Sequence, residues 1–217
     1  MSVFKISSKF LFFLFIIISC IGCMSFNYKP DLSLGLSSET IQAKVQIEEF
    51  IDETPQGDHS KKIGGTSCTS ADTLEGSLTV GITNAVMKAF YESQVFDIIT
   101  RRIDNPDLIL RGKIHRFYGK AGPNALFWCT IPIDPIWLFG VPVLSNEGEV
   151  DIEISLFSPK RELISSYRQM TEFSGLYTMY NNPTFGIGTQ LNNAFNKVIS
   201  EIRDKILLDK NKLERSN

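Results

Sequence analysis

The strictest pattern in the sequence is an alternation of apolar and polar residues from Val150 to Leu156. This period of two is typical of a strand with one buried face, and its apolar members are Val150, Ile152, Ile154 and Leu156. A turn at 158–160 follows, and a second strand pattern covers 163–173. The two segments together predict a β-hairpin, so the fold must contain an antiparallel pair of strands.

Further segments of the chain show the periodicity of regular elements. Strand patterns cover 44–51, 96–99 and 107–118, and apolar residues at helical spacing cover 72–94 and the residues after Gly188. The order strand, helix, short strand, strand, hairpin, helix predicts an α+β fold, a mixed α/β sandwich. We expect about four to five strands in one mixed sheet, with two helices on one face. Gly112 lies mid-strand on the apolar face, which predicts that a neighbouring side chain needs room there.

The N-terminal residues have the parts of an export signal. Lys5 and Lys9 form a short basic region, the side chains from Phe10 to Ile18 are all apolar, and no acidic residue occurs within 1–22. A bilayer crossing takes about 20 apolar residues, so the apolar run is too short to span. Residues 1–22 are therefore predicted to be a signal peptide, and a short N-terminal membrane anchor is the alternative.

The end of this signal resembles the lipobox of bacterial lipoproteins, in which a small residue precedes the lipidated cysteine. Cys23 follows Gly22 and is the predicted lipidation site, and Cys20 is the alternative because an aliphatic residue stands three positions before it. Met24 follows without an Asp beside it, which in Gram-negative lipoproteins implies sorting to the outer membrane. The resemblance implies an acyl anchor in the outer membrane and a domain that faces the periplasm. A redox Cys-x-x-Cys motif would open a helix after a strand rather than end an export signal.

Two cysteines, Cys68 and Cys129, remain in the mature chain if Cys23 carries the lipid. They form an even pair in an oxidising compartment, where disulfides persist. If the strands at 44–51 and 107–118 run parallel, the loops that leave them lie at the same end of the sheet, and each loop holds one of the two cysteines. A disulfide between Cys68 and Cys129 is therefore predicted, with two separate buried thiols as the alternative.

Composition is that of one globular domain rather than a disordered chain. Of 217 residues, 43% are hydrophobic and 21% charged, and 22 basic residues stand against 24 acidic ones. This balance argues against a nucleic-acid-binding domain. Residues 23–40 are predicted to be a flexible tether, residues 41–209 the domain, and residues 210–217 a frayed polar tail.

Two phrases of the domain carry a resemblance to a known family. A lipoprotein cysteine precedes the strand Ala43-Lys-Val-Gln-Ile-Glu-Glu-Phe-Ile-Asp52, a Gly-rich loop and a helix follow, and then comes Asn105-Pro-Asp-Leu-Ile-Leu-Arg-Gly-Lys-Ile114. Over residues 41–209 the chain resembles the YajG-type and CsgG-like envelope lipoproteins, whose domain is similar to the N-terminal domain of TolB. The resemblance implies a lipoprotein that works with other envelope proteins. The membrane-spanning hairpins of CsgG have no match, so pore formation is not implied.

An apolar insert at 124–144 departs from that family pattern. It contains both tryptophans and three prolines, which forbid a regular helix. Three interpretations stay open: a loop folded over one end of the sheet, a dip into the lipid interface with the Trp rings at headgroup depth, or a surface for a protein partner. The candidate contact residues are Phe127, Trp128, Trp137 and Phe139.

A catalytic constellation is not recognisable in the sequence. There is no Gly-x-Ser-x-Gly nucleophile elbow, and His59 and His115 lack metal-ligand spacing. The acids from Glu48 to Asp58 are interpreted as a solvated strand end, and Asp151, Glu153 and His115 as residues of a solvent-facing strand surface. No enzyme activity, metal or cofactor is predicted.

The sequence as a whole favours a non-catalytic lipoprotein of the outer membrane that binds other envelope proteins in assembly, transport or wall synthesis. The alternative is a carrier of a small ligand or lipid that uses the insert at 124–144.

Overall fold

The computed structural model describes residues 28–55, 76–126, 139–142, 144–178, 180 and 187–215. Its strands are β1 (Ile41–Ile47), β2 (Ile51–Asp52), β3 (Phe96–Thr100), β4 (Leu108–Pro123), β5 (Leu144–Phe157) and β6 (Leu163–Tyr177), and its helices are α2 (Leu78–Glu92), α4 (Ile187–Leu208) and α5 (Lys210–Arg215). Helix α2 begins later than the predicted residue 72, because Ser77 at its N-cap has extended backbone angles.

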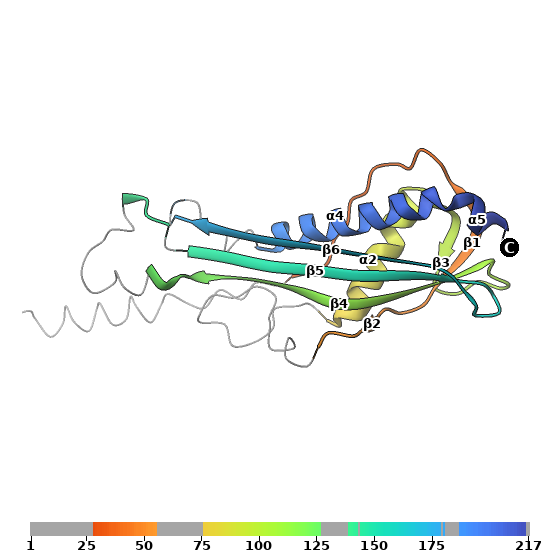
Figure 1. Ribbon diagram of the computed structural model, residues 1–217, viewed down its shortest axis with the longest axis horizontal. Coiled ribbons are helices and arrows are strands. Elements are labelled where there is room, and N and C mark those ends of the chain that lie inside the picture. The colour runs from red at the N-terminus through yellow and green to blue at the C-terminus, as the bar shows by residue number, and fades with distance from the viewer. Residues whose placement is uncertain are drawn as a thin grey trace, which may run out of the picture.

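The strands form one mixed sheet with the order β3–β1–β4–β5–β6, and β2 pairs with β4 (Figure 1). Strand β1 is parallel to β3 and β4, whereas β5 is antiparallel to both β4 and β6. The mixed α+β class is confirmed, but the described residues form six strands and three helices instead of the predicted four to five strands and two helices. The unpredicted elements are β2 and α5, which are too short to show a clear period in the sequence.

The parallel pairing of β1 and β4 agrees with the arrangement that the predicted disulfide assumed. However, the chain leaves β2 beside Ile114, and β4 continues to Pro123, about 30 Å farther at the usual rise per residue. The two loops therefore begin at different levels of the sheet. Cys68 and Cys129 lie outside the described residues, so the disulfide stays a prediction.

A β-bulge in β4 keeps one face of the strand apolar along its whole length. The register of β4 against β5 shifts between Ile114 and Arg116, so His115 has no partner across the ladder. The extra residue moves the alternation by one position. As a result the same face carries Leu108, Leu110, Gly112 and Ile114 before the bulge and Phe117, Gly119 and Ala121 after it.

Helices α2 and α4 pack on the same apolar face of the sheet and share one core with it. The buried residues include Ile82, Val86 and Phe90 of α2, Phe195, Val198 and Ile202 of α4, and Val45, Leu110, Ile152 and Ile154 of the strands. The Phe117 and Phe195 rings meet edge to face at 5.3 Å. None of the helices in the described ranges combines the length and apolar composition of a membrane-spanning segment.

Gly112 makes room for Phe50, as the strand pattern predicted. Phe50 is 2% exposed, and a Cβ added at Gly112 would overlap its ring. The Phe50 amide donates a hydrogen bond of 3.0 Å to Thr83 Oγ1 of α2. The connection between β1 and β2 is thereby fixed to both the sheet and the helix.

Residues 28–40 pack on the domain, although the sequence placed them in a flexible tether. Tyr28 and Leu32 are 2% and 3% exposed, and Tyr28 Oη donates a hydrogen bond of 2.6 Å to Asn192 Oδ1 of α4. Burial raises the pKa of Tyr28 well above its usual range, which keeps this donor protonated. The contact depends mainly on these two side chains. The segment around them is polar in composition, so the sequence pattern did not indicate that it packs. The part of the predicted tether before Tyr28 lies outside the described residues.

Residues 210–215 form α5, and the prediction of a frayed tail over 210–217 was wrong for this part. Leu213 is 0% exposed, and Glu214 Oε1 accepts a hydrogen bond of 3.1 Å from the Gln42 amide of β1. Lys212 Nζ donates a hydrogen bond of 2.8 Å to Ser165 Oγ of β6. One apolar anchor in a polar segment is enough to dock this short helix.

Candidate functional site

Charged residues form rows across the sheet face opposite to the helices, which we call the helix-free face. It consists of the side chains of β4, β5 and β6 that alternate with the core residues. Opposite charges on neighbouring strands stabilise the pairing by up to about 1 kcal/mol per pair. The rows in register are Lys113–Glu153–Arg168, Arg116–Asp151 and Lys120–Glu147.

Two acids of the helix-free face are buried. Glu149 and Asp151 are 4% and 2% exposed. Arg168 donates hydrogen bonds of 2.9 and 2.6 Å to the two oxygens of Asp151, and Arg116 Nη1 donates one of 2.9 Å to Glu149 Oε1. The bond with Asp151 raises the pKa of the Arg168 guanidinium. The interpretation of Asp151 as solvent-facing was wrong, because long arginine side chains from the neighbouring strands pair with the acids of β5.

His115 lies between two acids rather than in open solvent. Its Nε2 is 3.1 Å from Glu153 Oε2, its Nδ1 is 3.9 Å from Glu53 Oε2, and its side chain is 18% exposed. The bulge places it there, since His115 is the residue without a partner across the ladder. The strand pattern alone contained no sign of this bulge, so the solvated position predicted for His115 was wrong.

The acids that follow β1 also have partners, although they were interpreted as a solvated strand end. A hydrogen bond from Lys113 to Glu53 raises the pKa of that lysine. Asp58 lies outside the described residues. The contacts are Glu48 Oε2 with Arg111 Nε at 2.6 Å, Glu53 Oε1 with Lys113 Nζ at 2.8 Å, and Glu49 Oε1 with Thr79 Oγ1 at 2.7 Å.

The substitution Ser166→Ala is expected to lower stability at neutral pH more than at acid pH. Ser166 Oγ donates a hydrogen bond of 2.6 Å to Glu153 Oε1. This hydrogen bond lowers the pKa of Glu153, and the contact with His115 lowers it to a smaller extent. A lowered pKa stabilises the fold above the unfolded value of about 4.3, and this stability is lost as the pH falls through the folded value. We expect a loss of about 1 kcal/mol at neutral pH in urea titrations. Ser174→Ala, on the same strand face, is the control, and a loss independent of pH would contradict the prediction.

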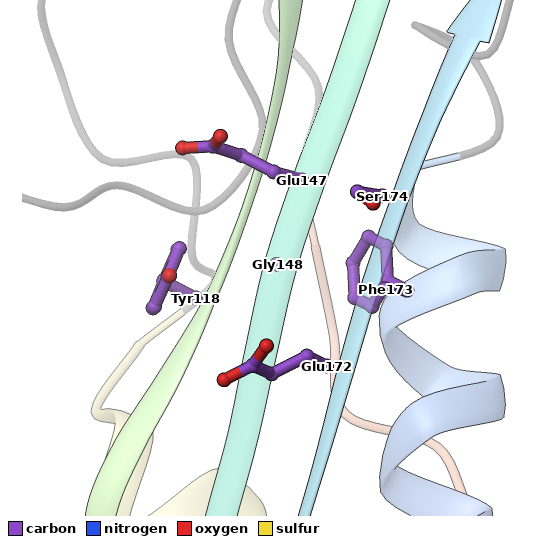
Figure 2. Close-up of a pocket in the computed structure, with 6 residues that line it drawn as sticks. All are labelled: Tyr118, Glu147, Gly148, Glu172, Phe173 and Ser174. Atoms are coloured by element: carbon purple, nitrogen blue, oxygen red, sulfur yellow. The ribbon is translucent and has the colours of Figure 1, made fainter.

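A hollow of about 460 Å³ lies on the helix-free face, in the half of the sheet that is nearer to the end of β4 and the start of β5 (Figure 2). Figure 2 shows Glu147 of β5 and Glu172 of β6 extending toward Tyr118 of β4, while the Phe173 ring stands beside Gly148. Glu172 lies opposite Glu149 in the ladder, and like charges in this position repel. Among the residues that the structure describes, no ion pair compensates Glu172. The hollow therefore offers an uncompensated carboxylate to a cationic group.

Exposed apolar side chains gather at the end of the sheet where β4 ends and β5 begins, which we call the distal tip. Pro123 pairs with Leu144, and Leu144 pairs with Tyr177, so the ends of the three strands lie together (Figure 1). Clustered apolar side chains on a surface mark interaction sites. The distal tip consists of Leu126 (50% exposed), Phe139 (83%), Leu176 (66%) and Tyr180 (71%).

Phe139 is the one predicted contact residue that falls within the described ranges, and it lies at the distal tip. Leu176 and Tyr180 were not among the residues predicted from the sequence pattern. The second strand of the predicted hairpin ended at residue 173, whereas β6 continues to Tyr177 and so reaches the same end of the sheet. The other predicted site residues lie outside the described residues. They are Cys20, Cys23, Cys68, Phe127, Trp128, Cys129 and Trp137.

The charged side chains of the helix-free face bind one another across the strands and so make the sheet rigid. Cations of β4 and β6 and the hydroxyl of Ser166 hold the acids of β5. Within the described ranges, no group of three or more His, Cys, Asp or Glu side chains is placed to hold a metal ion.

Comparisons with known proteins show a shared fold. The crystal structure of protein XCC0632 from Xanthomonas campestris, described with the family DUF330, matches with a TM-score of 0.54 at 11% identity, over 88% of this chain and 98% of that chain. At this identity the likeness extends to the fold and not to function. No family model matches the chain, and no curated protein matches it.

Two more solved structures match with lower scores. One is an uncharacterized protein, with a TM-score of 0.43 at 11% identity over 82% of this chain and 99% of that chain. The other is a candidate lipoprotein from Caulobacter crescentus CB15, with a TM-score of 0.31 at 14% identity over 67% of this chain and 85% of that chain. Both TM-scores are too low to establish a shared fold. The resemblance to YajG-type and CsgG-like lipoproteins stays a prediction.

Proposed function

We propose that the protein is a non-catalytic lipoprotein of the bacterial outer membrane that binds another envelope protein through its distal tip. The observation that carries the proposal is the exposure of Leu126, Phe139, Leu176 and Tyr180 toward one end of the sheet. The predicted export signal at 1–22, followed by Cys23 as the lipidation site, would supply the anchor. A partner with an apolar groove would bury these side chains.

The position of the chain near its anchor supports this role for the distal tip. The five residues from Cys23 to Tyr28 span at most about 17 Å. The ring of Tyr28 lies 6.1 Å from that of Phe117, and β4 runs from Phe117 to Pro123, about 20 Å farther. The reach of the chain therefore allows a lipid on Cys23 to approach the end of the sheet that carries the distal tip, and the tip would then meet partners close to the membrane surface.

The contacts of the helix-free face support a non-catalytic role. His115 and Glu153, the groups best suited to proton transfer, contact each other, and Glu153 also accepts a hydrogen bond from Ser166, so the network crosses three strands. Asp151 is held by Arg168 with both of its oxygens. These side chains stabilise the sheet in the arrangement that the structure shows.

A second candidate function, a carrier of a small ligand, is favoured by a hollow of about 310 Å³ between β6 and α4. Asn146 lines it, is 3% exposed, and has an Oδ1 atom without a hydrogen-bond partner among the described residues. The volume of this hollow is at the lower end of the range of ligand pockets, which begins at about 300 Å³. A small molecule retained in native mass spectra of the purified protein would favour the carrier.

Lipidation is tested on the mature protein. Mass spectrometry of the N-terminal peptide is expected to find acylated Cys23. Cys23→Ser is expected to remove the acyl group and to release the protein from membranes in an alkaline wash. Cys20→Ser, which is removed with the signal, is expected to change neither result. A mature peptide that begins at Cys20 would move the site, and an unmodified soluble N-terminus would overturn the lipoprotein proposal.

The partner surface is tested with a photo-crosslinking amino acid in the full chain. Placed at Phe139, it is expected to crosslink to one envelope protein in cells. Placed at Lys160, in the turn at the opposite end of the sheet, it is expected to give no such product. Leu126→Ser at the distal tip should reduce the yield from position 139. Crosslinks from position 139 to lipid alone would overturn partner binding and favour a lipid-interface role.

A further inference from the structure

Strand β6 is the last strand of the sheet that the described residues form. It pairs with β5, and no second strand of the described residues pairs with it. It is 15 residues long and contains neither proline nor lysine. Typical strands have about 5–6 residues, and proteins usually guard open edges with prolines, lysines or bulges. A register shift near Leu163 interrupts the start of β6, but from Ser165 to Tyr177 the ladder is regular and this edge is a template for another strand.

The pattern along this edge is symmetric about Met170. Leu163 and Tyr177, the two ends of β6, are equally far from it in sequence. An antiparallel ladder admits a two-fold axis at any pair of opposite residues, whether or not that pair is hydrogen-bonded. A second copy of the chain placed antiparallel with Met170 opposite itself would therefore pair β6 from Ser165 to Gly175, the part that lies beyond the register shift near Leu163.

On the helix-free face this register matches charges. It places Arg168 opposite Glu172 of the second copy and Glu172 opposite Arg168 of the second copy. Within its own chain Glu172 faces the buried Glu149 across the ladder. Arg168 binds Asp151, but its side chain is 56% exposed and its guanidinium has further donors. The second copy would thus supply the cation that Glu172 lacks among the described residues.

On the helix side the same register matches apolar rings. It places Tyr167 opposite Phe173 of the second copy, and Gln169 opposite Thr171. Tyr167 is 8% exposed and Phe173 packs against the core, so both rings are already held in place. Aromatic pairs across strands are among the stabilising pairs of antiparallel sheets.

Other registers lose this match. Sliding one copy by two residues, the smallest shift that keeps both faces, places Arg168 opposite Met170 or Ser174. Sliding it by four places Arg168 opposite Arg168, or Glu172 opposite Glu172, which is repulsive. The match is therefore specific to the register centred on Met170.

We infer that the protein forms a two-fold symmetric homodimer in which the β6 strands of two copies pair antiparallel around Met170, so that one continuous sheet crosses both copies. The dimer goes beyond the proposed function and does not depend on it, because its surface is the edge of β6 and not the distal tip. The occupant is a second copy, since the charge pattern of β6 complements itself.

Cysteine crosslinking tests the register in the full mature chain in its membrane. Met170→Cys is expected to give a disulfide between two copies of the peptide that carries residue 170, identified by mass spectrometry. Glu172→Cys is the matched control: the two copies of residue 172 would be about 13 Å apart, beyond the reach of a disulfide. Equal crosslinking at both positions, or none at 170, would overturn the inference.

A charge reversal tests the energetics independently. Glu172→Arg faces Arg168 of the second copy and is expected to raise the dissociation constant of the dimer about tenfold or more in sedimentation equilibrium. The same substitution relieves the repulsion from Glu149, so the thermal stability of the monomer, measured at a concentration below the dissociation constant, should not fall. Glu162→Arg, an equal change of charge in the β5–β6 turn, should leave the dimer unchanged. A protein that sediments as a monomer, or a dimer indifferent to Glu172→Arg, would contradict the inference.

Discussion

Replacing Arg168 with methionine is expected to lower the free energy of unfolding by about 3 kcal/mol, because it leaves the buried carboxylate of Asp151 without its cation. Asp151 has a side chain that is 2% exposed, and both of its oxygens accept hydrogen bonds from Arg168. Removing one partner of a buried pair costs more than the pair contributes, since the remaining charge has lost its water as well. Equilibrium unfolding in urea measures the difference.

Two further variants separate this cause from a general effect of removing a cation from the helix-free face. Lys120→Met breaks the pair with Glu147, whose side chains are 52% and 56% exposed, and is expected to change stability by less than about 1 kcal/mol. The double variant Asp151→Asn, Arg168→Met should recover a large part of the loss, because it removes the buried charge as well as the cation. A loss at Arg168 no greater than the loss at Lys120 would show that Asp151 does not depend on this bond.

Much of the sheet was predictable, because its period of two survives wherever one face is buried. The alternation from Val150 to Leu156 lies within β5, and the predicted hairpin with β6 is present. The bulge at His115 was not predictable, since one extra residue leaves no local mark and its position depends on the partner strand. The same lack of local information hid the extension of β6 to Tyr177.

The candidate site was less predictable than the fold. Acids on the outer side of a strand are usually solvated, and only the register places Arg116 and Arg168 beside the acids of β5. Polar segments at both ends of the domain were expected to be loose, but Tyr28 and Leu213 anchor them in the core. A single apolar residue changes the composition of a polar segment little, but its burial stabilises the packing of that segment considerably.

The substitution Gly112→Ala is expected to lower the free energy of unfolding by about 2–3 kcal/mol, because the added methyl group meets the ring of Phe50. The ring is 2% exposed and lies where the Cβ would be, and the Phe50 amide is bonded to Thr83, so the ring cannot move away without cost. Gly122→Ala is the matched control on the same strand, since no atom of the described residues lies within 4 Å of its Cβ position. It should be neutral or stabilising by about 0.5–1 kcal/mol, as alanine restricts the unfolded chain more than glycine does.

A compensating variant identifies Phe50 as the cause. Phe50→Leu leaves a smaller side chain above Gly112 and should itself cost about 1 kcal/mol in lost packing. In the double variant Phe50→Leu, Gly112→Ala, the added methyl group occupies part of the space that the ring vacates, so the total loss should be smaller than the sum of the two single losses. Additive losses in thermal or urea unfolding would show that the two positions are independent and that Gly112 is required for a different reason, such as backbone conformation.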